Sequence, residues 1–343
     1  MNGRIERLPV VVLYPHSRCN CRCIMCDIWQ DSRRQEIRPE QFERYLEDFR
    51  RLSVEWVVFS GGEPLLHSNL FPVCSKLREA GIRVTILSTG LLLEKHAGQV
   101  ANTVDDVIVS LDGPPPIHDR IRRVPHAFAR LARGVDAVHR LRPELPIAAR
   151  SVVERANFRE LRATIDTARQ LGLRSISFLA ADVDSSAFNR PGGWEEARKV
   201  EIALTADEIP ELESEIAALL REWRESPLLV QSAEKLLAIA RYYRARLGLA
   251  PAEAPHCNAP WVSAVIEADG LVRPCFFHEP IGHAGDGLLP VINSPRAIAF
   301  RDSLDVAANP ICRRCVCSLH WTGLSPAVAL GIERAPVPRP SGS

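Results

Sequence analysis

The sequence predicts an α/β protein with a partial (β/α)6 barrel, followed by a small C-terminal α+β domain. Two observations predict the barrel. Six short apolar runs recur between residues 8 and 180, and longer stretches with an apolar spacing near 3.6 lie between them. Parallel neighbours need a crossover helix, so these β-then-α units indicate one parallel sheet. Six units are too few for the closed eight-stranded barrel, and we therefore expect an open one.

The predicted strands are four to seven residues long, rich in Val, Ile and Leu. They cover residues 10–13, 56–59, 84–87, 107–111, 147–153 and 176–179. The helices predicted between them include residues 38–52, 70–80, 128–140 and 158–171. Gly81 and Gly172 follow two of these helices, where a left-handed C-cap favours glycine.

The chain after the last predicted strand divides into an insert and a helical stretch. Residues 181–206 are predicted to be irregular, because Asn189-Arg190-Pro191-Gly192-Gly193 lies at their centre. This insert is either a lid over an active site or a surface loop. Residues 207–248 predict two helices broken at Pro227. We assign residues 8–225 to the barrel domain, insert included, and residues 226–254 to a helical linker.

A second compact unit is predicted over residues 255–323. Strand-like runs at 261–267 and 271–277 flank Ala268-Asp269-Gly270, and an Asp-Gly pair between two such runs is typical of a hairpin. Residues 324–343 form a Pro-rich tail, which we predict to be disordered.

Charge and hydropathy exclude several classes of protein. The 43 basic and 42 acidic side chains leave a net charge of +1, which argues against a nucleic-acid-binding protein. No apolar run approaches the roughly 18 residues that span a bilayer. The early apolar run is also too short for a secretory signal. We therefore expect a soluble, cytoplasmic protein. In such a chain, clustered thiols among the ten cysteines indicate metal binding rather than disulfides.

The first cysteine group directly follows the first predicted strand, where open α/β sheets bind ligands. It reads Cys19-Asn20-Cys21-Arg22-Cys23-Ile24-Met25-Cys26. The Cys-x3-Cys-x2-Cys spacing of Cys19, Cys23 and Cys26 allows one loop to bind three corners of an iron–sulfur cubane. The spacing differs from that of ferredoxins, so the fourth iron has no local protein ligand. An iron without a protein ligand is typical of a reactive metal centre. The alternative interpretation of this cysteine spacing is a zinc knuckle.

Further polar segments end the next three predicted strands. Ser60-Gly61-Gly62-Glu63-Pro64 follows the second strand, and a Gly-Gly pair allows the backbone to approach a ligand closely. Ser88-Thr89-Gly90 ends the third strand, and Ser110-Leu111-Asp112-Gly113 ends the fourth. His118-Asp119-Arg120-Ile121-Arg122 comes shortly afterwards.

In this order, over residues 8–180, these motifs resemble those of the radical S-adenosylmethionine (SAM) superfamily. The resemblance implies a 4Fe-4S cluster held by Cys19, Cys23 and Cys26, whose unique iron chelates SAM. Reductive cleavage of SAM would then give a 5′-deoxyadenosyl radical that abstracts hydrogen from a substrate. The chain departs from the family at Met25, where an aromatic residue is usual, and in lacking an Asn beside Ser88. Cys21 is extra, either a small loop thiol or a ligand.

The resemblance also implies roles for the other motifs. Gly61, Gly62, Glu63 and Pro64 would bind the SAM ammonium. Arg122 would pair with the SAM carboxylate, because a guanidinium fork suits a carboxylate; a solvated surface charge is the alternative. The hydroxyls of Ser88 and Ser110 would contact the ribose or carboxylate of SAM. The alternative is that each hydroxyl only caps the helix that follows it.

A second cysteine group lies within the predicted C-terminal unit. Gly270 stands before Cys275 in a Gly-x4-Cys segment, and Cys257 precedes both. Cys312-Arg313-Arg314-Cys315-Val316-Cys317 closes the group. The pattern resembles SPASM and twitch extensions, and five cysteines fit the twitch type with one auxiliary 4Fe-4S cluster. The implied ligands are Cys257, Cys275, Cys312 and Cys315, with Cys317 as a possible substitute. A four-thiolate zinc site is the alternative. The isolated Cys74 is expected to pack in the core.

The leading hypothesis is therefore a radical SAM enzyme whose auxiliary cluster assists oxidation of an organic substrate. Many peptide-modifying relatives have a winged-helix module before the barrel, which we do not see here, and this favours a small molecule over a peptide. A peptide-modifying enzyme of the maturase type, a group transferase and a non-catalytic zinc scaffold are the alternatives. The expected electron donor is a flavodoxin or ferredoxin. The sequence assigns no catalytic acid or base.

Overall fold

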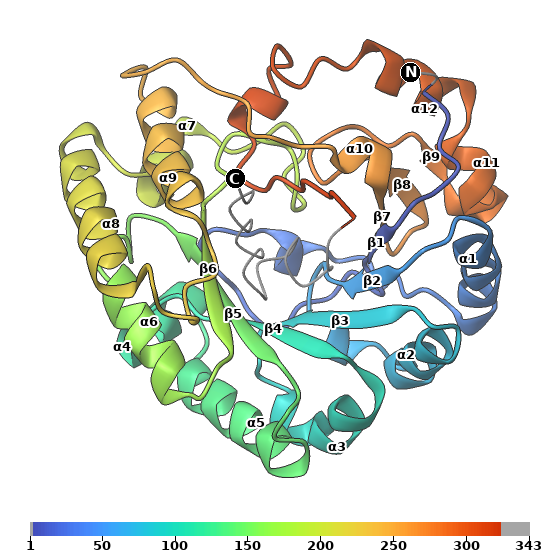
Figure 1. Ribbon diagram of the computed structural model, residues 1–343, viewed down its shortest axis with the longest axis horizontal. Coiled ribbons are helices and arrows are strands. Elements are labelled where there is room, and N and C mark those ends of the chain that lie inside the picture. The colour runs from blue at the N-terminus through green and yellow to red at the C-terminus, as the bar shows by residue number, and fades with distance from the viewer. Residues whose placement is uncertain (1–2, 324–343) are drawn as a thin grey trace, which may run out of the picture.

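The computed structural model describes residues 3–323, whose strands form one curved nine-stranded sheet (Figure 1). The strand order is β6-β5-β4-β3-β2-β1-β7-β8-β9. The six core strands are β1 (Val10–Leu13), β2 (Trp56–Phe59), β3 (Arg83–Ser88), β4 (Asp106–Ser110), β5 (Ile147–Val153) and β6 (Ser175–Ala180). Each pairs in parallel with the next, which confirms the predicted α/β class and the central parallel sheet.

Helices cover the outer face of this sheet, leaving the inner face as the lining of an open arc (Figure 1). They are α1 (Pro39–Arg51), α2 (Leu70–Glu79), α3 (Leu93–Thr103), α4 (Pro115–Arg122), α5 (Ala127–Leu141) and α6 (Leu161–Gln170). The sequence had predicted α1, α2, α5 and α6, but neither α3 nor α4. Gly81 and Gly172 have φ of 76° and 69°, which confirms the two left-handed C-caps.

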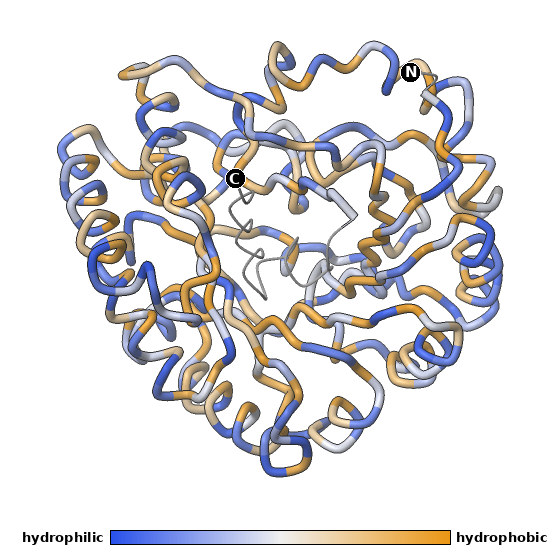
Figure 2. The backbone as a smooth tube through the Cα atoms, in the orientation of Figure 1, coloured by the Kyte–Doolittle hydropathy of each residue, from blue (hydrophilic) through white to orange (hydrophobic). Residues whose placement is uncertain are grey.

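The apolar residues of the strands divide between two cores because successive side chains point to opposite faces. The main core, between the sheet and the helices, contains Val11 and Leu13. A separate inner cluster contains Val10, Trp56 and Val58, and Trp321 packs against it. In Figure 1 the red end of the coloured ribbon, before residue 323, lies inside the arc, and Figure 2 shows orange apolar residues along the strands. The segment around Trp321 therefore fills part of the barrel interior.

The C-terminal strands continue the core sheet. Strand β7 (Ser263–Ile266) pairs in parallel with β1, and β8 (Leu271–Arg273) returns antiparallel to β7. This confirms the predicted hairpin, with shorter strands. The two-residue strand β9 (Gly282–His283) completes the sheet. Before and after the strands lie α10 (Ala259–Val262), α11 (Leu288–Ile292) and α12 (Pro295–Ser303).

The insert after β6 is more ordered than predicted. Residues Glu196–Ile202 form the helix α7, so the expectation of an irregular stretch over 181–206 is wrong for this part. The helices α8 (Ile209–Trp223) and α9 (Ala233–Arg246) confirm the pair broken at Pro227. Short 3-10 helices lie at Ile28–Gln30, Pro64–Leu66, Ala206–Glu208, Ala284–Asp286 and Cys312–Arg314. The predicted disordered tail, 324–343, lies outside the described residues.

Over residues 3–323, no helix combines the length and the apolar character that a membrane crossing requires.

Candidate active site

The first cysteine group forms a loop that follows β1 in the sequence and pairs through its backbone with the end of α4. The backbone N–H of Arg22 donates to the carbonyl of Arg122 at 3.1 Å, and that of Ile24 donates to Ile121 at 3.0 Å. Cys23 is buried, whereas Cys19 and Cys26 are half-buried. Backbone pairing to a helix end therefore holds all three predicted ligands in one short loop at the C-terminal end of β1.

Cys23 has the most acidic thiol of the loop. A hydrogen bond from the Cys21 thiol and the charge of the Arg122 guanidinium together lower the pKa of Cys23 to about 6, although burial opposes the shift. Burial instead raises the pKa of Cys19, and it raises the pKa of Cys26 to about 12. The extra cysteine, Cys21, is thus a buried hydrogen-bonding neighbour of Cys23 in the same loop.

The Gly-Gly-Glu turn lies directly against the start of the cysteine loop. A Cβ at Gly62 would be 2.0 Å from the carbonyl oxygen of Arg18, so only glycine fits there. At Gly61 φ is 91°, and a Cβ would be 2.8 Å from the Tyr14 ring. The N–H of Glu63 donates to the same Arg18 carbonyl at 3.0 Å. The structure therefore brings together two motifs that are far apart in the sequence.

The Glu63 carboxylate is fully buried and fully hydrogen-bonded. It accepts from the Thr89 hydroxyl at 2.6 Å and the Thr89 N–H at 2.7 Å. The Ser88 hydroxyl donates to it at 3.0 Å and the Leu65 N–H at 3.1 Å. Burial raises the pKa of Glu63, and these donors oppose that shift. The Glu63 side chain, with Pro64 at the start of the next turn, thus ties the Gly-Gly turn to the end of β3.

Arg122 is buried, so it is not a surface charge. It forms an ion pair with the buried Asp112, and its Nη1 donates to Cys23 Sγ at 3.4 Å. Within residues 3–323 its Nε has no hydrogen-bond partner. Ser110 is half-buried near the end of β4, in register with Arg150 on β5.

Glu154 is a residue of this region that the sequence analysis missed. It follows β5 and is fully buried, and neither carboxylate oxygen has a hydrogen-bond partner in the described part of the chain. Burial, followed by the charge of Asp112, raises its pKa to about 8. One acidic residue after a strand forms no motif, so no local pattern indicates a role for it.

The unpartnered buried atoms near Cys23 provide a test of whether a polar ligand fits. Among residues 3–323 they include Asn20 Nδ2, Arg122 Nε and both carboxylate oxygens of Glu154. Buried polar groups are nearly always paired, so such a set indicates donors and acceptors for a bound molecule. Three cysteines beside these atoms match the donor set of an iron–sulfur cluster that binds a polar ligand.

The insert covers the first cysteine loop and contacts the C-terminal domain. Asn189 Nδ2 donates to the carbonyl of Asp27 at 3.1 Å, and Trp194 Nε1 donates to the Asp27 carboxylate. The ring of Phe188 lies 6.3 Å from that of Phe276, measured between centroids. Of the two readings of the insert, these contacts favour the lid.

The second cysteine group is brought together by the fold. Burial and the charges of neighbouring thiols raise the pKa of Cys275 to about 11, and Cys257 and Cys312 are among those neighbours. The Cys315 thiol donates to the Cys317 carbonyl at 3.2 Å. His278 Nε2 lies 3.4 Å from Cys312 Sγ. Within the described residues, no three Cys, His, Asp or Glu side chains are arranged to hold a single metal ion.

Tyr14 lies near residues of both cysteine groups. Burial raises its pKa, and negative charge on Glu267, on Cys26 of the first group and on Cys317 of the second adds to the shift. Its ring stacks on Phe276, the neighbour of Cys275, with centroids 6.2 Å apart. One aromatic side chain is therefore close to both groups.

Two family models match the chain. Residues 13–168 match the model of the radical SAM superfamily, and residues 257–316 match that of the iron–sulfur cluster-binding SPASM domain. The first implies a 4Fe-4S cluster and SAM, and the second implies auxiliary iron–sulfur clusters. The matches cover the first cysteine group and all of the second group except Cys317.

Curated relatives match over part of their length. Fe-coproporphyrin III synthase of Methanosarcina barkeri is 27% identical over 205 residues, 57% of this chain and 50% of the relative. PqqA peptide cyclase of Ruegeria pomeroyi is 27% identical over 164 residues, 46% of this chain and 43% of the relative. The chain thus spans half or less of these relatives.

A solved structure shows the same fold. Streptococcus suis SuiB bound to S-adenosylmethionine superposes with a TM-score of 0.64 at 15% identity, covering 92% of this chain and 74% of SuiB. The same protein bound to its precursor peptide SuiA gives a TM-score of 0.66, covering 92% and 73%.

Proposed function

Because the chain belongs to the radical SAM superfamily and carries a SPASM domain, we propose that it reductively cleaves SAM and removes a hydrogen atom from an organic substrate. The observation that carries the proposal is the contact of Gly62 with the residue before Cys19, which joins the two motifs into one site. With the cluster and SAM bound, the chemistry supplied is one-electron cleavage of a SAM carbon–sulfur bond.

Cys19, Cys23 and Cys26 are the proposed ligands of the first cluster. Arg122 holds the Cys23 thiolate through Nη1, and Asp112 balances the charge of the guanidinium. The free Nε of Arg122 is the donor that remains for the carboxylate of SAM.

The Gly61-Gly62-Glu63-Pro64 turn is the proposed site for the SAM ammonium. The carboxylate of Glu63 is already occupied by Ser88 and Thr89. We therefore assign the ammonium contact to backbone carbonyls of this turn, because a carbonyl accepts readily from an ammonium group. Ser110, with no role in holding the turn, stays a proposed contact of the ribose or carboxylate of SAM.

The second group would hold an auxiliary 4Fe-4S cluster. Cys257, Cys275, Cys312 and Cys315 are the proposed ligands, and Cys317 is a possible substitute. Four thiolates close a cubane, which suits electron transfer rather than binding of substrate. Such a cluster would supply an acceptor for the electron that the substrate radical gives up, and the closeness of Tyr14 to residues of both groups supports that role.

The proposed substrate is a small organic molecule. Similarity to a coproporphyrin-forming synthase supports this class. Similarity to a peptide cyclase supports the second candidate, modification of a peptide. A flavodoxin or ferredoxin as electron donor, and a cytoplasmic location, belong to the same proposal.

The test measures iron, sulfide and 5′-deoxyadenosine after anaerobic reconstitution with SAM and a reductant. A variant combining Cys19→Ala, Cys23→Ala and Cys26→Ala should form no 5′-deoxyadenosine. It should still hold about four irons, as one closed cubane does. Cys74→Ala removes a buried thiol outside both groups and is the matched control, so it should keep both clusters and the activity.

Formation of 5′-deoxyadenosine by the triple variant would contradict the proposed reaction. Loss of all iron in that variant, with one cluster in the unmodified chain, would instead show that the second group is a zinc or thiol structure. Redox-neutral chemistry would then be the better proposal.

A further inference from the structure

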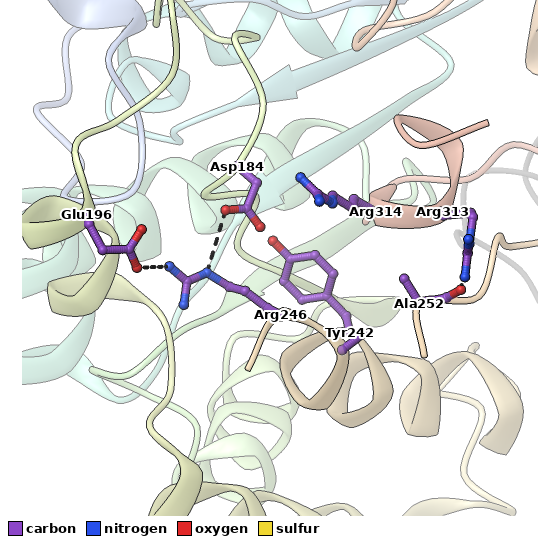
Figure 3. Close-up of a pocket in the computed structure, with 8 residues that line it drawn as sticks. Asp184, Glu196, Tyr242, Arg246, Ala252, Arg313 and Arg314 are labelled. Atoms are coloured by element: carbon purple, nitrogen blue, oxygen red, sulfur yellow. Dashed lines mark hydrogen bonds and ion pairs between the residues drawn. The ribbon is translucent and has the colours of Figure 1, made fainter. Parts of the chain in front are cut away.

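A cavity of about 240 Å³ lies beside the second cysteine group (Figure 3). The walls come from the insert, the helices α7 and α9, the linker and the 3-10 helix Cys312–Arg314. The lining residues are Asp184, Glu196, Tyr242, Ala245, Arg246, Ala252, Arg313 and Arg314. None of them belongs to the motifs of the first cysteine group.

The two acidic residues of the cavity are already paired with basic ones. Arg246 Nη2 donates to Glu196 at 2.9 Å, and its Nε lies 3.7 Å from Asp184 (Figure 3). Lys199 Nζ lies 3.6 Å from Asp184 and 3.5 Å from Glu196. Two carboxylates are therefore matched by two cationic side chains.

Two further guanidinium groups have no acidic partner in the described part of the chain. Arg313 donates from Nε to the carbonyl of Ala252 at 2.8 Å, which fixes its position. Arg314 makes no side-chain hydrogen bond or ion pair among residues 3–323, and it lines the same cavity. The Nε of Arg246, in a side chain that is 10% exposed, also lacks a hydrogen-bond partner there. The cavity thus has a net positive charge and unused donors.

We propose that this cavity binds the oxyanion, a phosphate or a carboxylate, of a small molecule. A planar guanidinium matches either group with two parallel N–H donors. The Tyr242 hydroxyl, which accepts one long hydrogen bond of 3.4 Å from the Val183 N–H, is a further donor. The volume exceeds that of inorganic phosphate, so the cavity has room for a molecule larger than its anionic group.

The position of the cavity connects it to the auxiliary site. Arg313 and Arg314 are the two residues between Cys312 and Cys315, and Asp184 follows shortly after β6. An anion bound here lies next to the proposed ligands of the auxiliary cluster. Binding itself needs neither SAM nor turnover, so the inference stands apart from the proposed reaction.

The test is calorimetric titration of the reconstituted full chain with inorganic phosphate and, separately, with succinate, at constant ionic strength. We expect saturable binding of one anion per chain, and the tighter of the two probes identifies the group. Loss of one charge-assisted hydrogen bond weakens binding about tenfold or more, so Arg313→Gln and Arg314→Gln should each show this change. Arg44→Gln, at an exposed position on α1, is the matched control and should bind normally.

Tyr242→Phe keeps the cavity wall and lies outside the cysteine segment, so it tests the site even where an arginine variant loses iron. It should weaken binding about threefold, because it removes a neutral donor. Absence of saturable binding, or equal weakening by Arg44→Gln and Arg314→Gln, would overturn the proposal. Unchanged affinity in all three cavity variants would overturn it as well.

Discussion

Arg122 donates a hydrogen bond from Nη1 to Cys23 Sγ over 3.4 Å. The same guanidinium forms an ion pair with Asp112, and both side chains are buried. One arginine at the end of α4 therefore connects the cysteine loop to the segment after β4. The arrangement resembles a support for a metal ligand, in which a neighbour sets the orientation and charge of the ligating atom.

Replacing Arg122 should destabilise the chain even without iron. Arg122→Gln leaves Asp112 buried without an opposite charge, which costs about 3–5 kcal/mol. Urea unfolding of the iron-free protein measures this loss. Arg123→Gln, at the exposed neighbouring position, should change the free energy of unfolding by about 0.5 kcal/mol or less. Equal stability of the two variants would contradict a role for the ion pair.

Gly62→Ala should disrupt the contact between the Gly-Gly turn and the cysteine loop. Its Cβ would be 2.0 Å from the Arg18 carbonyl oxygen, so the backbone must move. We expect a loss of about 2 kcal/mol or more in unfolding free energy and no 5′-deoxyadenosine from the reconstituted protein. Gly98→Ala in α3, where a Cβ meets nothing within 4 Å, is the control. It should be neutral or stabilising by about 1 kcal/mol, because alanine favours a helix.

Glu154 should make the stability of the iron-free chain depend on pH. Its folded-state pKa of about 8 is above the ordinary value of 4.5, so the folded state holds the proton more tightly. The resulting stabilisation is present below pH 4.5 and is lost as the pH rises towards 8. Glu154→Gln should remove this decline, which amounts to a few kcal/mol, on the order of 1.4 per pKa unit. Urea unfolding between these limits measures it.

The exposed Glu40 provides the comparison for that experiment. Glu40→Gln should leave the pH dependence of wild-type stability unchanged. A Glu154→Gln profile that parallels the wild type would show that the Glu154 carboxyl finds a partner or solvent in solution.

Trp321 should contribute to stability from inside the barrel. It is 8% exposed and packs with Val10, Trp56 and Val58. Trp321→Ala should therefore cost about 3–5 kcal/mol in thermal or urea unfolding of the iron-free protein. Ile311→Ala, at a side chain that is 39% exposed, should cost far less. A small effect at Trp321 would mean that the C-terminal segment leaves the barrel interior in solution.

Local sequence patterns were sufficient to predict most of the strands and helices of the barrel. Strand β1 is a run of valines ending in leucine, β2 is a run of valines between aromatic residues, and the observed bounds of both equal the predicted ones. The helix α3 was missed because Gly98 and polar residues weaken its apolar spacing. The start of α4 does carry a signal, since proline at the first turn of a helix is favourable and Pro115 stands there.

The features of the candidate site also divide into local motifs, which can be predicted, and contacts between distant segments, which cannot. Cysteine spacing and the Gly-Gly pair are local features, and the motifs they form were readable in order along the chain. The partners of Glu63, at the end of another strand, and the isolation of Glu154 depend on which strands are neighbours. No local window contains that information.

Local spacing along short segments is sufficient to predict the alternation of strands and helices, the class of site and its cysteine groups. Three relationships appear only in the folded chain: the stack of Tyr14 on Phe276, the packing of Trp321 inside the barrel, and the cavity that Arg314 lines with Arg246. These relationships join residues that are far apart in the chain, and their positions depend on strand order and on the packing of the whole sheet.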